Sequence, residues 1–272
     1  MSNFSDFISG GGSASYPTIF LHNSQTWVPP QDGNIMIHVI GAGGSGSGAQ
    51  NTSTESGAAG GYCRKNSLAV TTSGSFTVVI GAGGAGTLGA YGAGAAGGNT
   101  TVAGTGLSST LTATGGAGGA LATNAYTTGG VGSNGDVNTT GGRGGYRKGG
   151  GAVGLLGTGN DGLISTLASY ASRGGSCDIL GDFYSSTLGQ LSGAVGGDGT
   201  TLQSNPYANS GYNENPRAEP LAGGGSLWTT IADAQRQMDA TIGGGGGWIY
   251  AQAKSCYSGG GGEGCVVIQY IP

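Results

Sequence analysis

The sequence of 272 residues is poor in charge and in aromatic side chains. Only 8% of its residues are charged and 7% are aromatic, which excludes a surface dense in salt bridges and a heavily aromatic core. Nine basic residues stand against thirteen acidic ones, giving a formal net charge of −4. Nucleic acids and anionic membranes both require clustered Lys and Arg. The composition therefore favours neither as a partner.

Proline and long apolar runs are also scarce. Seven prolines without a sustained Gly-X-Y register exclude a collagen. The first ten residues have neither the basic start nor the apolar stretch of a signal peptide, and no run approaches the roughly 18 apolar residues of a membrane span. We therefore expect no export signal in this sequence.

Residues that commonly carry catalysis or bind metals are few. The four cysteines, Cys63, Cys177, Cys256 and Cys265, match neither CxxC metal pairs nor a compact disulfide framework, and we expect small buried apolar residues. His22 falls in a predicted turn and His38 in a predicted strand, where structural roles are expected. Asp178 and Asp182 are the nearest approach to a carboxylate pair. We expect no enzymatic activity, no metal and no cofactor.

What the sequence has in excess is glycine, with 65 residues in clusters. Each glycine costs about 0.5 to 1 kcal/mol relative to alanine on folding, so ordered clusters must be stabilised densely. Gly41–Gly46, Gly81–Gly86 and Gly115–Ala120 place a side chain at every third position. This spacing matches the polyproline II helix, whose two bare faces allow hydrogen bonds between neighbouring backbones. Flexible linkers, the alternative, would carry more serine and more charge.

Several segments between the clusters are predicted strands. Asn34–Ile40 alternates but is apolar on both faces, which indicates a strand covered on both sides. Ser75–Ile80 and Cys265–Ile271 are similar runs, and Thr18–Leu21 and Gln25–Val28 flank a polar turn. We expect the first strands to pair with the last and to close one domain. Helical spacing occurs only over Thr230–Thr241.

The predicted fold is therefore all-β with irregular glycine-rich layers. Strands from both ends of the chain close a sandwich-like stack of polyproline II helices. Gly41–Gly46 and Gly81–Gly86 each match G-x-G-x-x-G after a strand, as in dinucleotide-binding sites. No helix pattern follows either one, so no helix N-terminus is available for a pyrophosphate. We interpret the two copies as an architectural repeat.

Aromatic and basic residues in the connections are candidates for recognition. Tyr and Trp offer rigid contact area with a polar handle, and the densest basic cluster adjoins one of the tyrosines. These residues would bind a polar or anionic ligand such as a cell-surface glycan; alternatively, they cap the glycine stack. The candidate set is Tyr91, Tyr126, Arg143, Tyr146, Arg147, Lys148, Tyr184, Tyr207, Tyr212, Trp228, Trp248, Tyr250 and Tyr257, with Tyr170 also in a connection.

The order of these elements resembles a known family. The segments that carry the resemblance are Phe20–Pro29, Ile35–Gly44, Gly61–Val70, Phe76–Gly84, Gly98–Thr101, Leu111–Gly116 and Gly262–Tyr270. Together they look like the glycine-rich domain of bacteriophage tail fibres and related virion proteins. The layout is also similar to that of receptor-binding adhesins at fibre tips, in which stacked glycine helices present variable loops.

The resemblance implies a domain organisation and a function. Residues 1–15, with Phe4, Phe7 and Ile8, would attach the protein to the virion, and residues 16–272 would form the glycine-rich domain. Residues 152–241 depart from the family pattern and are the expected host-facing region. The implied protein is a distal tail-fibre or adhesin subunit that is made in the host cytoplasm and located in the virion. Its partners would be other tail proteins and a host glycan or outer-membrane protein, and a homotrimer is allowed.

Two other functions remain open. A structural fibre, spacer or decoration protein would bury its aromatic loops against virion partners instead of a receptor. An ice-binding protein can also be built from stacked glycine helices, but it needs a regular Thr or Ala array on one flat face. The irregular spacing of the sequence does not predict such an array.

Overall fold

The structure is a computed structural model of the chain. It describes residues 17–49, 55–87, 91–121, 126–145, 161, 227–229, 243, 249–251, 258 and 260–272. Within these residues the chain is all-β, with fourteen strands and no helix. Among them, accordingly, no helix is long and apolar enough to cross a membrane. The helical spacing over Thr230–Thr241 lies outside the described residues.

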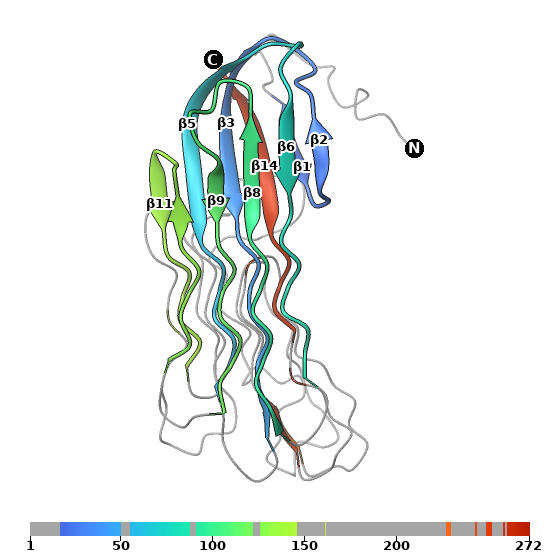
Figure 1. The fold of residues 1–272 in the computed structure, drawn as a ribbon, viewed down its shortest axis with the longest axis vertical. Coiled ribbons are helices and arrows are strands. Elements are labelled where there is room, and N and C mark those ends of the chain that lie inside the picture. The colour runs from blue at the N-terminus through green and yellow to red at the C-terminus, as the bar shows by residue number, and fades with distance from the viewer. Residues whose placement is uncertain are drawn as a thin grey trace, which may run out of the picture.

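The first sheet, sheet A, joins the two ends of the chain. Its strands are antiparallel in the order β1-β14-β3-β5-β11. Their bounds are Thr18–Leu21 for β1, Cys265–Ile271 for β14, Gly33–Ile40 for β3, Tyr62–Val70 for β5 and Val137–Thr139 for β11. Because β14 lies between β1 and β3, the expected pairing with the last strand is confirmed for Thr18–Leu21 and Asn34–Ile40 (Figure 1). The predicted strand at Gln25–Val28 belongs instead to the second sheet.

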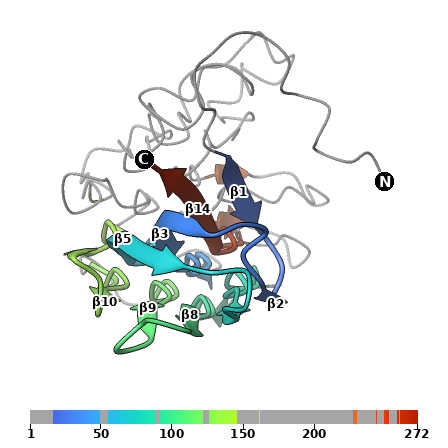
Figure 2. The same cartoon turned by 90° about the horizontal axis from the view of Figure 1, so that it is seen from above.

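The second sheet, sheet B, is also antiparallel and has the order β10-β9-β8-β6-β2. Its strands are β2 (Gln25–Trp27), β6 (Phe76–Val79), β8 (Thr100–Gly104), β9 (Leu111–Ala113) and β10 (Gly132–Ser133). Sheet B packs on sheet A, and β8 and β9 form a layer beside β3 and β5 (Figure 2). The all-β sandwich that the sequence predicts is confirmed.

Two connections close the sandwich along its sides. Strands β1 and β2 follow one another in sequence but belong to different sheets, and so do β10 and β11. In the second connection Asn134 has a φ of 65°, a left-handed conformation that Asn adopts more readily than most residues. Each turn therefore carries the chain from one sheet to the other, and the sandwich approaches a flattened barrel.

Strand β5 was not predicted, and a β-bulge explains why. The register against β3 moves from Ile35 opposite Leu68 to Ile37 opposite Lys65, so β5 holds one extra residue there. Asp136 binds at the bulge, accepting hydrogen bonds from Lys65 Nζ and from the Asn66 amide at 2.8 Å each. The polar residues of the bulge interrupt the apolar alternation by which strands are recognised in sequence.

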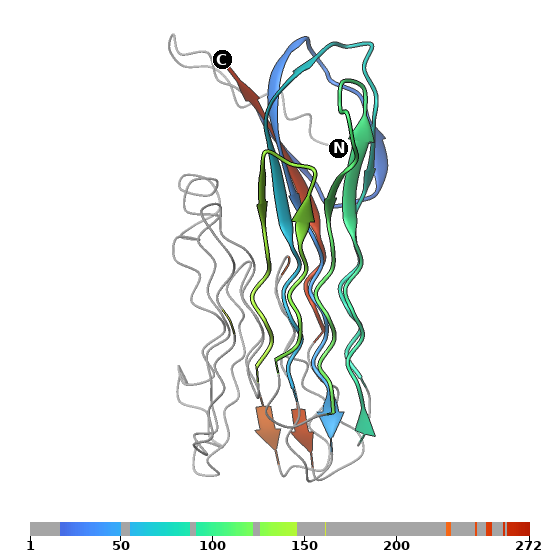
Figure 3. The ribbon, with the colours of Figure 1, turned by 60° about the vertical axis from the view of Figure 1, so that its left-hand side comes forward.

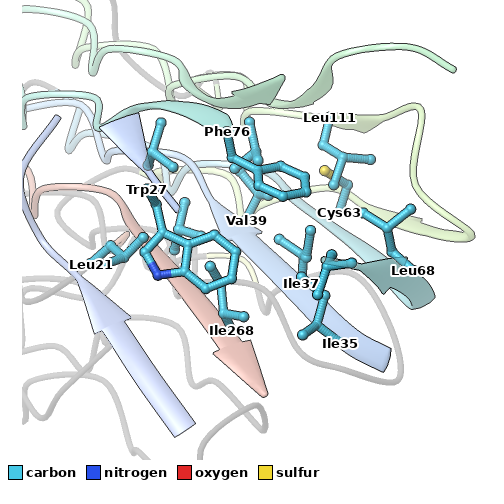
Figure 4. Close-up of a cluster of buried hydrophobic side chains, with 14 of the residues drawn as sticks. Leu21, Trp27, Ile35, Ile37, Val39, Cys63, Leu68, Phe76, Leu111 and Ile268 are labelled. Atoms are coloured by element: carbon cyan, nitrogen blue, oxygen red, sulfur yellow. The ribbon is translucent and has the colours of Figure 1, made fainter. Parts of the chain in front are cut away.

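The core lies between the sheets. Ile35, Ile37 and Val39 point inward from β3 and are fully buried, and Trp27 packs against Phe76 with ring centroids 5.5 Å apart (Figure 4). Burying one such side chain contributes about 1.5 to 3 kcal/mol. This small core therefore stabilises only the strand-rich end of the molecule directly.

The other face of β3 is buried as well, as predicted. His38 is 1% exposed, and its Nδ1 lies 2.7 Å from the Tyr62 hydroxyl. Its Nε2 lies 3.4 Å from Gln269 Oε1, so the neutral ring can accept from Tyr62 and donate to Gln269. The pKa of His38 is lowered to about 4, mainly by burial; the Gln269 hydrogen bond opposes this shift and the charge of the nearby Arg64 adds to it.

The glycine segments continue from the strands and are bonded to one another through their backbones. In residues 41–47 the amides of Gly41, Gly44 and Ser47 donate to one neighbouring segment, at the carbonyls of Gly61, Ala58 and Glu55. Ala42 and Ser45 donate to a second neighbour, at Gly98 and Ala95, and Gly43 donates to a third, at Gly262. The backbone amides of successive residues thus donate hydrogen bonds to three different neighbouring segments, and the pattern repeats about every three residues.

This period is the one that a helix with three residues per turn would give. The polyproline II conformation itself stays a prediction. The segments run side by side away from the sheets (Figure 3). Residues 41–47, which carry a G-x-G-x-x-G pattern, belong to this array and continue directly into a short strand at residues 48–49. Their interpretation as an architectural element agrees with the structure.

Neighbouring glycine segments approach too closely for side chains between them. A Cβ at Gly97 would overlap the carbonyl oxygen of Ala42, and one at Gly60 would overlap that of Gly41. Because backbone atoms are the obstacle, rotation of a side chain cannot relieve the overlap. The backbones of these segments are in mutual contact, and this contact fills the interior where apolar side chains would normally lie.

Substitution of Gly97 tests this packing. We expect Gly97→Ala to lower the free energy of unfolding by about 3 kcal/mol or more, at the upper end of the cost of overpacking. Gly74→Ala is the matched control, because a Cβ there would meet nothing nearer than the Thr71 carbonyl oxygen at 3.1 Å. Urea unfolding of both variants measures the difference. If both variants lose the same small amount of unfolding free energy, the glycine segments can move apart to accept a side chain, and the packing argument is wrong.

Acid should destabilise the protein through His38. The folded-state pKa of about 4 lies below the usual 6.5, so the unfolded chain binds a proton first as pH falls. This contribution is complete above pH 6.5 and is lost between 6.5 and 4, amounting to about 3 kcal/mol. In His38→Gln the loss of unfolding free energy between pH 7 and pH 4 should shrink by that amount. If the wild type and His38→Gln have the same pH dependence of stability, other titratable groups cause the acid destabilisation.

Candidate functional site

The molecule has two unlike ends. The two sheets form one end, and the glycine segments reach the opposite end, which we name the distal end and define by a third sheet, sheet C (Figure 1). Sheet C has the order β12-β13-β4-β7. Its strands are β12 (Leu227–Thr229), β13 (Ile249–Ala251), β4 (Gly48–Ala49) and β7 (Tyr91–Gly92). It joins segments from the first and last parts of the chain.

Three of the predicted recognition residues meet in sheet C. In its register Trp228 is opposite Tyr250, Tyr250 is opposite Ala49, and Ala49 is opposite Tyr91. These positions form one row across four strands, which lie about 4.8 Å apart in a sheet. The topology of the chain therefore gathers three aromatic positions at the distal end, although they are far apart in the sequence.

A second group contains two more predicted residues, Tyr126 and Arg143. The Arg143 guanidinium carbon lies 4.2 Å from the centre of the Tyr126 ring, a cation–π contact. The adjacent backbones are joined where the Thr127 amide donates to the Gly144 carbonyl at 2.8 Å. Both residues lie in the last turns of glycine-rich segments, where the local backbone is fixed by neighbouring segments.

Asp161 completes this second group. It accepts from the Arg143 amide at 2.7 Å, from Nε at 2.9 Å and from Nη2 at 2.6 Å. Burial raises the pKa of Asp161, but the hydrogen bonds and charge of Arg143 outweigh burial and hold the pKa below its usual value. Arg143 is thus held by two partners of this chain, and a ligand would meet it as part of the Tyr126–Arg143–Asp161 group.

Sequence reasoning missed Asp161. It is a single acidic residue in a glycine-rich stretch, 18 positions after Arg143, and no motif marks it. The other candidates fall outside the described residues: Tyr146, Arg147, Lys148, Tyr184, Tyr207, Tyr212, Trp248 and Tyr257, together with the attachment residues Phe4, Phe7 and Ile8. So does most of residues 152–241, the expected host-facing region.

The described residues with catalytic chemistry are dispersed. Among them no three His, Cys, Asp or Glu side chains gather as a metal site would require. His22 is exposed and stacks on Phe20 with centroids 6.4 Å apart. Cys63 and Cys265 are free and buried, as expected, and burial raises the pKa of these thiols to about 11 and about 12. Both are therefore protonated at neutral pH.

Together these features define a class of protein: an all-β sandwich extended by hydrogen-bonded glycine segments that end in a small distal sheet. The family model of the glycine-rich domain matches residues 20–271. The chain therefore belongs to the glycine-rich domain family. A search of curated proteins finds no match.

Titration of Asp161 tests the second group. In Arg143→Gln we expect the pKa of Asp161 to rise, because burial persists while the charge and the Nε and Nη2 hydrogen bonds are lost. Carbon-13 NMR of the carboxyl resonances measures this. Asp136, whose pKa is lowered by Lys65, is the internal control and should not move. An Asp161 titration that is the same in both proteins would contradict the pairing.

Proposed function

We propose that this protein is a bacteriophage virion protein, a distal tail-fibre or adhesin subunit that binds a receptor on the bacterial surface. The observation that carries the proposal is the row of Trp228, Tyr250 and Tyr91 at the distal end. Aromatic residues dominate the binding energy of many interfaces because they bury a large rigid area at low entropic cost. The receptor would be a glycan or an outer-membrane protein.

We assign different functions to the two ends of the molecule. The Tyr270 amide donates to the Pro17 carbonyl at 3.1 Å, so the segment before residue 17 leaves the fold at the end that holds the sheets. Residues 1–15 would then attach the protein to other tail proteins from that end. The glycine segments between the ends act as a rigid spacer, because each is bonded to several neighbours. This polarity supports the proposal that the receptor binds at the distal end.

The proposal assigns no chemistry to the protein beyond binding. It needs no cofactor and no metal, and it places the protein in the virion after synthesis in the host cytoplasm. The Tyr126–Arg143–Asp161 group offers a second, polar contact area. Asp161 lies within residues 152–241, the expected host-facing region, and its three hydrogen bonds join it to Arg143 in a glycine segment.

Binding to bacteria tests the proposal. Labelled protein is mixed with a panel of strains, and retention on cells and competition with phage adsorption are measured. Alanine in place of Tyr91, Trp228 and Tyr250 together should weaken binding at least about thirtyfold, the effect of losing one interface hot spot of about 2 kcal/mol. His22→Ala, an exposed ring far from sheet C in sequence and outside its strands, should leave binding unchanged.

Two results would contradict receptor binding. Folded wild-type protein that adsorbs to no strain, while still binding other tail proteins, would favour a structural spacer or decoration protein. Equal binding by the triple variant and the wild type would remove the aromatic row from the receptor site.

A further inference from the structure

The charged residues of this chain are distributed very unevenly. Residues 66–135 contain no Asp, Glu, Lys, Arg or His, so all nine basic and thirteen acidic residues lie elsewhere in the sequence. An uncharged stretch of this length is unusual even at 8% charge, and burial explains only part of it, since Phe76, Val102 and Leu111 belong to the core. Many of its residues are exposed.

This uncharged stretch builds one layer of the molecule. It supplies four of the five strands of sheet B, and the glycine segments that continue from them are hydrogen-bonded neighbours. The Gly98 amide donates to Ala82, the Gly97 and Gly94 amides donate to Gly116 and Gly119, and the Thr114 and Ala117 amides donate to Val131 and Thr128. Segments 81–87, 93–99, 114–120 and 127–131 therefore lie side by side in that order. We name the outer side of this layer the uncharged face.

The strand register gives the residues of this face. The inward positions of sheet B are the buried Phe76, Val78, Val102 and Leu111. The outward positions form two rows, in which the strands contribute Val79, Thr101, Thr112 and Ser133 to one and Thr26, Thr77 and Ala103 to the other. In the glycine segments exposed alanines recur at three-residue intervals, at 82 and 85 and at 93 and 96.

The chemistry of the face differs from that of an ordinary solvated sheet. Soluble surfaces intersperse charges of both signs, whereas the centres of protein interfaces are depleted of charge. Here the exposed groups are methyls, hydroxyls and bare glycine backbone, together with the amide of Asn99. Val79 is 43% exposed at one end of the row that contains Thr101 and Thr112, and Val131 is 50% exposed beside β10. Exposed apolar side chains on a face without charge indicate that a partner covers this face.

We propose that the occupant of the uncharged face is a second copy of this chain, packed against it about a two-fold axis. Rows of small side chains separated by glycine grooves are self-complementary, so the ridges of one copy fit the grooves of the other. Because the chain's net charge of −4 resides entirely outside residues 66–135, two copies meet on this face without repulsion between residues of that stretch.

The size of the face agrees with a stable dimer. Four neighbouring segments of about 8 to 12 residues, spaced at about 4.8 Å and rising about 3.1 to 3.3 Å per residue, cover roughly 20 by 35 Å. The resulting area of roughly 700 Å² approaches the ~800 Å² that each partner buries in a standard interface. This inference is independent of receptor binding, and it replaces the homotrimer that the family resemblance allowed with a two-fold dimer.

Sedimentation equilibrium of the full chain, from low to high micromolar concentration, tests the proposal. Wild-type protein should fit a monomer–dimer equilibrium. Val79→Lys and Thr112→Lys, which each place a charge on the outer side of sheet B, should raise the dissociation constant at least about tenfold. Gln31→Lys is the matched control, because Gln31 is exposed and lies outside both the face and residues 66–135. Thermal unfolding confirms that all variants fold.

The other outcomes are distinct. A wild-type monomer over the whole range, or a dimer that both lysine variants leave unchanged, would overturn the proposal. A trimer would exclude the two-fold arrangement. Monomeric protein that shows thermal hysteresis, lost in Val79→Lys, would make an ice surface the occupant, since the face does present threonine and alanine side chains in rows.

Discussion

The structure depends on hydrogen bonds between glycine backbones that touch. Each bond of this kind contributes only about 0.5 to 1.5 kcal/mol net, so no single one is decisive. Their number and regularity matter, because successive residues of one segment address three different neighbours. Removing a side chain from every contact position lets peptide groups approach to bonding distance. The entropy that glycine loses on folding is offset by this dense network.

The network explains how the two ends can be so different. The sheets at one end have an ordinary apolar core, with Trp27 and Phe76 between them. Beyond the sheets the chain continues in the same lateral order, but the contacts change from side chain against side chain to backbone against backbone. The order of the strands is therefore transmitted along the molecule, and Ala49 and Tyr91 reach neighbouring strands at the distal end.

Much of this fold follows from local sequence pattern. The strands over Thr18–Leu21 and Cys265–Ile271 have the predicted bounds, because short runs rich in β-branched and aromatic residues are typical of strands. The period of three in the glycine segments could also be recognised in the sequence, since every third residue has a side chain. The bulge in β5 was not, because the polar Lys65 and Asn66 are stabilised by Asp136, a residue far away in sequence.

The candidate site was predictable only in part. Tyrosine and tryptophan could be recognised as candidates by type, but their gathering into one row depends on strand pairings between residues near 49, 91, 228 and 250. No local pattern encodes these pairings. Asp161 shows the same limit, because a single carboxylate gains significance only from the Arg143 and Tyr126 beside it.

The antiparallel return of the glycine segments has an evolutionary consequence. Residues 47 and 55 are paired by a backbone hydrogen bond, and so are residues 117 and 128, so each pair of segments joined by a distal connection is held together by hydrogen bonds outside that connection. The number and kind of residues joining such a pair can change without altering any pairing below it. Lineages could exchange these connections freely, as antibodies exchange their hypervariable loops, while keeping one framework.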